Sequence, residues 1–248
     1  MGRSLSIAAR TWVAVFVAVV VVQLTAEATG AEDLARVSQW LLMPVLAAVV
    51  ASATRWPRGH LVTWVLVALG FSWLGDLVPS LVGDDASFLV MVGFFLLAQV
   101  AYVVAFAPHA GRSVLRRRPV LLLPYAAVLV GLVAVCAPGA GALLVPVAVY
   151  GGVLTAMAVL ATGLGRLAAV GGAVFLVSDS LIALDAFVPS WDLAGQGFWV
   201  MLTYVVGQGL LASAVVVRNA TERRAPQLRP VRAPAQRPPV PDNVVALV

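Results

Sequence analysis

The sequence predicts an all-α protein, a polytopic membrane bundle of eight transmembrane helices that occupies residues 1–217. Its composition is the first observation behind this prediction. Hydrophobic residues make up 62% of the 248 residues and charged residues only 11%. The mean hydropathy is +1.00, whereas about half of the residues in a soluble domain are apolar. This composition is typical of a protein that lies within a lipid bilayer.

The second observation is the length of the apolar runs. A helix needs about 17 to 25 apolar residues to cross a hydrocarbon core of about 30 Å. Helices are expected because backbone in lipid must satisfy its own hydrogen bonds. The runs cover residues 11–27, 37–53, 60–79, 87–107, 119–137, 140–161, 167–187 and 198–217. Successive gaps are marked by loop-forming residues, in order Gly30, Pro57, Gly83, Pro108, Pro138, Gly163 and Pro189.

The third observation is the distribution of arginine between the loops. With eight spans, fifteen of the sixteen arginines fall on one side of the membrane and Arg36 alone on the other. Positively charged loops stay in the cytoplasm, so both termini are predicted to be cytoplasmic in a multi-pass protein of the cell membrane. The basic balance of the chain therefore reflects topology and attraction to anionic lipids, and nucleic-acid binding is not expected.

Two segments at the ends of the chain admit separate interpretations. The first run follows Arg3 and Arg10 and ends near Ala26-Glu27-Ala28, a pattern that also resembles a cleavable signal peptide. Residues 218–248 are rich in Pro and Arg and cannot bury a core. We expect this second segment to form a disordered cytoplasmic tail.

The inventory of reactive residues excludes several kinds of chemistry. Cys136 is the single cysteine, so neither an internal disulfide nor a cysteine-based metal cluster is possible. His60 and His109 lie far apart, without acids at ligand spacing, so no metal site and no Ser-His-Asp triad is expected. The chain has no lysine, which excludes a Schiff base. No cofactor is predicted.

Acidic residues inside the apolar runs are the strongest functional signal. Asp76 and Asp179 lie within spans, and Asp185 lies near an outer helix end. A carboxylate at membrane depth is costly, so such groups usually face the bundle interior and mark a functional site. At a rise of about 1.5 Å per residue, Asp76 lies about 24 Å and Asp179 about 18 Å from the cytoplasmic end. The two acids are therefore near enough in depth to act together.

Helical spacing adds neighbours to these acids. Residues three or four positions apart share one face of a helix. The pairs with this spacing are Ser72 with Asp76, Phe175 with Asp179, Gln99 with Tyr102, and Tyr204 with Gln208. Four such faces could converge on one cavity.

An internal repeat is also possible. LLMP at 41–44 recurs as LLVP at 143–146, and the offset from Asp76 to Asp179 matches this spacing within one residue. Spans 1–4 would then correspond to spans 5–8 as a parallel 4+4 repeat. Chance matches in an apolar sequence are the alternative.

At these residues the sequence resembles the YhhN/TMEM86 family of membrane lysoplasmalogenases. The matching stretches are FSWLGD (71–76), FFLLAQVAYVVAF (94–106), GGAVFLVSDSLIAL (171–184) and VMLTYVVGQGLL (200–211). Two departures from the family pattern stand out. Gln39-Trp40 replaces a common Lys-Pro pair, and Gln99 stands where a His is common. These departures leave the aspartates as the acid/base pair.

The resemblance implies hydrolysis of the vinyl ether of lysoplasmalogen to a fatty aldehyde and a glycerophospho-base. The partners it implies are a lysophospholipid substrate and the surrounding membrane lipids. One carboxyl group would protonate the alkene carbon and the other would stay ionised to activate water, as in glycoside hydrolysis. We expect Asp179 to be the proton donor and Asp76 the base. The residues expected to position water and the glycerol hydroxyl are Ser72, Gln99, Tyr102, Ser178, Tyr204 and Gln208.

Two other functions fit the same residues. Paired intramembrane acids and a repeat are also typical of a small-molecule or proton-coupled transporter. Both acids could instead be structural, held by Ser and Tyr hydroxyl groups that fix helix packing. The sequence leaves the oligomeric state open.

Overall fold

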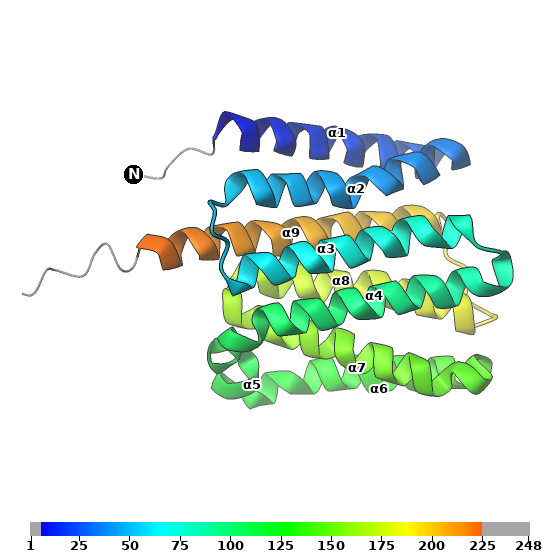
Figure 1. Ribbon diagram of the computed structural model, residues 1–248. Coiled ribbons are helices and arrows are strands. Elements are labelled where there is room, and N and C mark those ends of the chain that lie inside the picture. The colour runs from blue at the N-terminus through cyan, green and yellow to red at the C-terminus, as the bar shows by residue number, and fades with distance from the viewer. Residues whose placement is uncertain (1–5, 225–248) are drawn as a thin grey trace, which may run out of the picture.

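The computed structural model describes residues 6–224, which form helices and no strand (Figure 1). The prediction of an all-α polytopic bundle is therefore confirmed. The long helices are α1 (Ile7–Thr29), α2 (Glu32–Ala53), α3 (His60–Leu77), α4 (Asp84–Phe106), α6 (Leu122–Ala140), α7 (Leu144–Ala161), α8 (Arg166–Phe187) and α9 (Gln196–Arg224). A short helix, α5 (Val114–Arg117), joins α4 to α6.

Seven helical segments of the described chain are long and apolar enough to cross a membrane. One of them, Pro119–Leu164, is 46 residues long and contains both α6 and α7. The chain turns between them at Gly141, whose φ of 50° favours glycine. Because α6 and α7 pack side by side, this segment crosses twice, and the eight predicted spans correspond to eight long helices.

Local sequence explains where the first helices begin and end. The Ser6 side chain accepts a hydrogen bond from the Ala9 N–H at 3.1 Å and caps the start of α1. The helix ends at Gly30, which adopts a left-handed conformation with φ of 69°. Glu32 and Asp33 lie in the first turn of α2, where negative charge favours the helix dipole. Gly30 and Ala31 thus form the turn between the first two spans.

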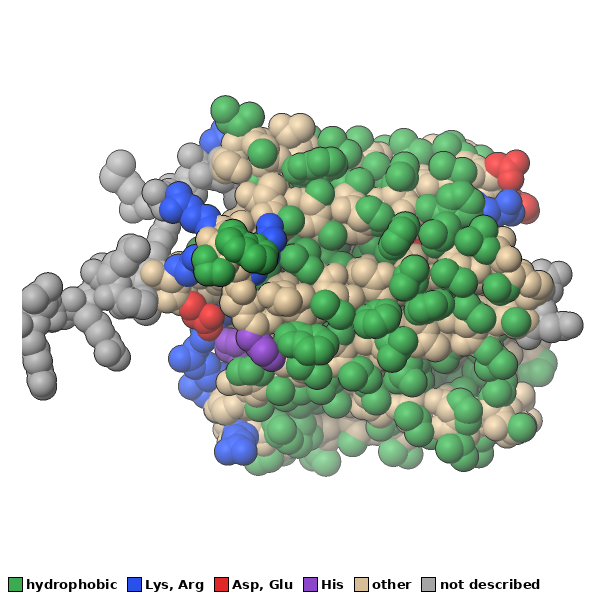
Figure 2. All heavy atoms as spheres, viewed as in Figure 1, with side chains coloured by type: hydrophobic (Ala, Val, Ile, Leu, Met, Phe, Trp, Pro, Cys, Tyr) green, Lys and Arg blue, Asp and Glu red, His purple; other side chains and the backbone are tan. Residues whose placement is uncertain are grey.

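The chain passes back and forth so that the two ends of the described chain lie at the same end of the bundle (Figure 1). The α2–α3 turn, α5 and the start of α8 lie at this end as well. In Figure 2, arginine side chains and the histidines gather there. The loops that the sequence assigned to one side of the membrane by their arginines thus lie together. We call this side the arginine-rich end.

Small residues bring α8 and α9 into close contact at the centre of the bundle. A Cβ added to Gly207 would lie 3.0 Å from the Phe175 backbone nitrogen, and one added to Gly171 would lie 3.0 Å from the Gly207 oxygen. Close approach of helices through small residues is typical of membrane bundles. It places Phe175, one turn before Asp179, directly against α9.

The last helix extends beyond the predicted span. α9 continues past Val217 to Arg224, so the first residues assigned to the tail are helical. Arg218 pairs with Glu222 at 2.7 Å, one turn apart, and Glu222 also contacts His109 at 3.0 Å. No proline interrupts the helix before Pro226. The remaining part of the predicted tail, 225–248, lies outside the described residues.

Helices α1–α4 and α6–α9 are the two halves of the suggested repeat, which stays a prediction. The two acids do occupy the third helix of each half, α3 and α8.

Candidate active site

Asp76 lies near the end of α3 and is hydrogen-bonded at both carboxyl oxygens. Gln39 from α2 donates to Oδ1 at 3.0 Å, and the Tyr204 hydroxyl from α9 donates to Oδ2 at 2.9 Å. The Asp76 side chain is buried, with 7% of the residue exposed. An ionised carboxylate accepts hydrogen bonds at both oxygens. The arrangement therefore suits the charged form of Asp76.

A second hydrogen-bonded chain lies one helical turn away on α3 and α9 and also includes α4. The Tyr102 hydroxyl donates to Gln208 Oε1 at 2.5 Å, and Gln208 Nε2 donates to Ser72 Oγ at 3.1 Å. These three side chains are buried and come from α4, α9 and α3. The predicted faces of these helices thus converge, and Ser72 lies on the same face as Asp76.

Asp179 lies on α8 in a different setting. The Tyr150 hydroxyl from α7 donates to its Oδ2 at 2.5 Å. Within residues 6–224 this is the single side-chain donor that Asp179 receives, against two for Asp76. The residue is as buried as Asp76, with 7% exposed. The two carboxyl groups are therefore equally shielded from solvent but unequally supplied with donors.

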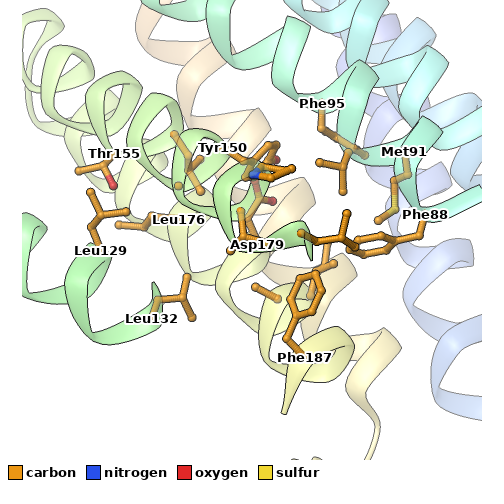
Figure 3. Close-up of a pocket in the computed structure, with 18 of the residues that line it drawn as sticks. Phe88, Met91, Phe95, Leu129, Leu132, Tyr150, Thr155, Leu176, Asp179 and Phe187 are labelled. Atoms are coloured by element: carbon orange, nitrogen blue, oxygen red, sulfur yellow. The ribbon is translucent and has the colours of Figure 1, made fainter. Parts of the chain in front are cut away.

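Asp179 faces a cavity of about 70 Å³ between α4, α6, α7 and α8. Figure 3 shows Asp179 and Tyr150 meeting at this cavity, with Phe88 and Met91 on one side and Leu132 on another. Apart from Asp179, Tyr150 and Thr155, the lining is apolar. The carboxyl group is thus the main polar feature of a hydrophobic chamber.

The cavity has a lateral opening between α4 and α6. Leu89 on α4 and Val128 on α6 both line it, and 52% and 44% of these residues are exposed. An apolar surface exposed along membrane-crossing helices faces lipid chains. An alkyl chain could therefore pass from the cavity into the bilayer without crossing a polar surface.

Three aromatic rings, those of Phe95, Phe175 and Tyr204, connect the surroundings of the two acids. The Tyr204 ring meets the Phe95 ring edge-on at 5.7 Å and the Phe175 ring at 5.7 Å. Its hydroxyl binds Asp76, while Phe95 also lines the cavity of Asp179. Phe95 therefore lies between the cavity of Asp179, which it lines, and the tyrosine that binds Asp76.

Gln99 lies in the same region, one turn after Phe95 on α4. It is fully buried and adjoins Tyr150, the partner of Asp179. Its carboxamide makes no hydrogen bond of good geometry within the described part of the chain, although the Tyr150 hydroxyl lies within its reach. A buried amide without partners is costly, so this position is suited to binding a water molecule or a substrate hydroxyl group.

Ser178 is a predicted site residue whose side chain binds neither acid in the structure. Its hydroxyl donates to the Val200 carbonyl of α9 at 3.0 Å, which joins α8 to α9. Asp185, the third acid noted in the sequence, is exposed near the end of α8. Neither side chain is hydrogen-bonded to the partners of Asp76 or Asp179.

Sequence reasoning missed two partners of the acids. Gln39 was noted as a departure from the family pattern, but not as a ligand of Asp76. Tyr150 is a hydroxyl-bearing side chain within the apolar run 140–161, and this was the available signal. Both lie on helices other than those of the acids, where spacing along one helix gives no information.

A scan against family models matches the YhhN family over residues 34–215, from early α2 to late α9. The matched region contains both acids and every hydrogen-bonded partner described for them. No curated protein and no solved structure matches the chain. The match covers well over half of the sequence, and this multi-pass membrane protein belongs to the YhhN family.

Proposed function

We propose that the protein is an integral-membrane hydrolase that cleaves the vinyl ether of lysoplasmalogen-like lipids. The products are a fatty aldehyde and a glycerophospho-base. The unequal setting of the two buried acids is the observation that supports this proposal. Asp76 carries donors on both oxygens, whereas Asp179 opens onto an apolar cavity. Vinyl ether hydrolysis needs such a pair, because one acid must deliver a proton and the other must accept one.

Protonation of carbon is the first step. Asp179, in its neutral form, gives its proton to the alkene carbon that is not bonded to oxygen. The electron pair of the double bond forms the new C–H bond, and the ether oxygen shares the resulting positive charge as an oxocarbenium ion. Asp179 is then a carboxylate, and the Tyr150 hydroxyl stabilises it by a hydrogen bond.

Water attacks the oxocarbenium carbon in the second step. The ionised Asp76 takes the proton of the water molecule, and a neutral hemiacetal results. Collapse of the hemiacetal breaks the bond to the glycerol oxygen, which receives the proton from Asp76. The hemiacetal hydroxyl proton passes to Asp179. Both acids return to their starting forms, so a second turnover needs only substrate and another water molecule.

Phe95 must turn aside for this sequence, because it lies between the cavity of Asp179 and the tyrosine that binds Asp76. With the ring displaced, the surroundings of the two acids become one site along the length of an enol ether. Gln99 then lies between Tyr150 and the Asp76 network, where its free amide can hold the attacking water. The chain of Ser72, Gln208 and Tyr102 orients the glycerol hydroxyl.

The substrate chain enters through the lateral opening. A cavity of about 70 Å³ holds the reacting enol ether but not a long alkyl chain. The rest of the chain extends between α4 and α6 into the bilayer, past Leu89 and Val128. Such a route suits an amphiphile that reaches the site from within the membrane.

Aldehyde release by the purified protein is the direct test. The full-length chain in detergent should release aldehyde from a synthetic lysoplasmalogen, and should not act on the saturated ether with the same chain. Asp76→Asn and Asp179→Asn should each lower the rate by a factor of about 10² to 10⁴, the usual contribution of an acid or base. Asp185→Asn is the matched control on α8 and should keep full activity.

Two results would contradict the proposal. If Asp179→Asn kept the same full turnover as Asp185→Asn, the Asp179 carboxyl group would have no part in the reaction. Flux of a solute into liposomes, with no covalent product, would identify a transporter instead.

A further inference from the structure

A second apolar groove, lined by neither acid, lies between α1, α2 and α9. Its volume is about 620 Å³, within the range of about 300 to 1,000 Å³ that is typical of ligand sites. Val13, Leu46 and Val216 represent the three helices in its lining, and Ser213 is its polar member. The groove is much larger than the cavity at Asp179, and the proposed reaction does not use it.

The groove lies beneath a stretch of α1 that has no fully buried residue, although Phe16, Val19 and Val20 pack partly buried against the core. The buried residues of α1 are Ala9 at one end, and Gln23 and Ala26 at the other. Gln23 accepts a hydrogen bond from Ser38 of α2 at 2.6 Å, which fixes the second attachment. Between these points, residues 10–22 of α1 are partly or fully exposed, and the groove lies beneath their first half.

Arginine residues closely follow three lining residues at the arginine-rich end of the groove. Arg10 follows Ala9, Arg55 comes two residues after Ala53, and Arg218 follows Val217. The same region forms part of the arginine-rich end (Figure 2). One acid, Glu222, lies nearby and pairs with Arg218. The local balance is therefore positive, at the level where an apolar groove meets the membrane surface.

We propose that this groove binds one acyl chain of an anionic phospholipid, whose phosphate group lies among these arginines. The groove opens to the bilayer, so its occupant is a membrane lipid rather than a soluble molecule. Charge complementarity selects an anionic head group, because basic residues near the membrane surface attract such lipids. The bound lipid joins α1 to α2 and α9 over the stretch where α1 has no buried residue.

Lipid retention tests the proposal. The full-length protein is extracted from nanodiscs with equal amounts of dioleoyl phosphatidylglycerol and dioleoyl phosphatidylcholine, and bound lipid is counted by native mass spectrometry. We expect one retained phosphatidylglycerol. Arg55→Gln should lower its retention about fivefold, as expected for one basic residue near the surface. The matched control Arg117→Gln, on exposed α5, should leave retention unchanged.

A filled groove provides an independent test. Ser213→Leu adds bulk inside the groove and should abolish retention, and Val13→Phe should do so from the facing helix. Ala156→Leu adds the same bulk on the exposed face of α7 and should have no effect. Thermal unfolding without lipid verifies that the variants are folded.

Three outcomes would overturn the proposal. Equal retention of phosphatidylcholine would remove the charge selection. Equal retention by Ser213→Leu and Ala156→Leu would place the lipid elsewhere. Loss of aldehyde release in the filled-groove variants, together with competition by lysoplasmalogen, would make the groove a substrate path.

Discussion

At the level of single residues, Asp179 depends on one hydroxyl group, that of Tyr150. In the proposed mechanism, Tyr150→Phe removes the donor that stabilises the Asp179 carboxylate left after proton transfer. A hydrogen bond to a charged group contributes about 1.5 to 3 kcal/mol, so kcat should fall by a factor of about 10 to 100. Tyr125→Phe on α6 is the control and should keep its kcat. Steady-state aldehyde release measures both, and equal rates would separate Tyr150 from the reaction.

Protonation at carbon leaves an isotopic mark. Turnover in D₂O should give an aldehyde with one deuterium on the carbon next to the carbonyl group, since Asp179 delivers a solvent-derived proton there. Mass spectrometry of the trapped aldehyde measures this. An unlabelled aldehyde would show that the ether bond breaks by another route, even if both acids are essential.

The sequence predicted part of the site at this scale. Intramembrane acids are rare, so Asp76 and Asp179 could be recognised from cost alone. Ser72, Tyr102, Tyr204 and Gln208 were recognised by helical spacing, and the structure joins them in hydrogen-bonded pairs or chains. The contacts of Gln39 and Tyr150 with the acids, and the direction of the Ser178 side chain, depend on how neighbouring helices are rotated. A helix that is apolar all round carries little signal of that rotation.

At the level of helices, the contact between α3 and α4 determines where the Phe95 ring lies. A Cβ added to Gly75 would lie 2.9 Å from the Phe95 ring, so Gly75→Ala should press the ring toward the Asp179 cavity. Turnover should fall several-fold, to an extent that depends on whether the ring can move. Gly70→Ala on the same helix meets no atom within 4 Å and should be neutral.

A double-mutant cycle isolates the Phe95 effect. Phe95→Leu should relieve the wedge, so that the pair Gly75→Ala and Phe95→Leu is more active than the sum of single effects predicts. Additive losses would show that Gly75 acts through something other than this ring.

The packing of α8 against α9 contributes to the stability of the helical bundle. Gly207→Ala would put a methyl group 3.0 Å from the Phe175 nitrogen, and backbone atoms cannot turn aside. Overpacking of this kind costs about 1 to 3 kcal/mol. The melting temperature in detergent should fall. Gly209→Ala, whose Cβ would make an ordinary contact with Phe16 at 3.8 Å, should melt like the parent protein, and equal losses in both would refute the packing argument.

At the scale of the whole molecule, arginine placement gives a topology that can be measured. In a Cys136→Ala background, Ser80→Cys lies at the opposite end of the bundle from Arg117→Cys. We expect an impermeant maleimide to label Ser80→Cys in intact cells, and Arg117→Cys only after lysis. The reverse pattern would invert the proposed orientation.

The overall fold was the most predictable level. Apolar run length fixes the number and limits of spans, since the bilayer sets one scale for every helix. The end of α9 was less predictable, because Arg218 and Glu222 support a helix beyond the apolar run. The groove beneath α1 could not be predicted at all, since it depends on where a mostly exposed helix is attached.

The turn at Gly141 has a consequence for biogenesis. The chain carries no charged side chain from Pro119 to Gly165. No charge that could set membrane orientation therefore lies within α6, within α7 or in the turn between them. The nearest signals are Arg118 before the pair and Arg166 after it. With positive charges at both outer ends of the pair and none between, we expect α6 and α7 to insert into the membrane together as a helical hairpin.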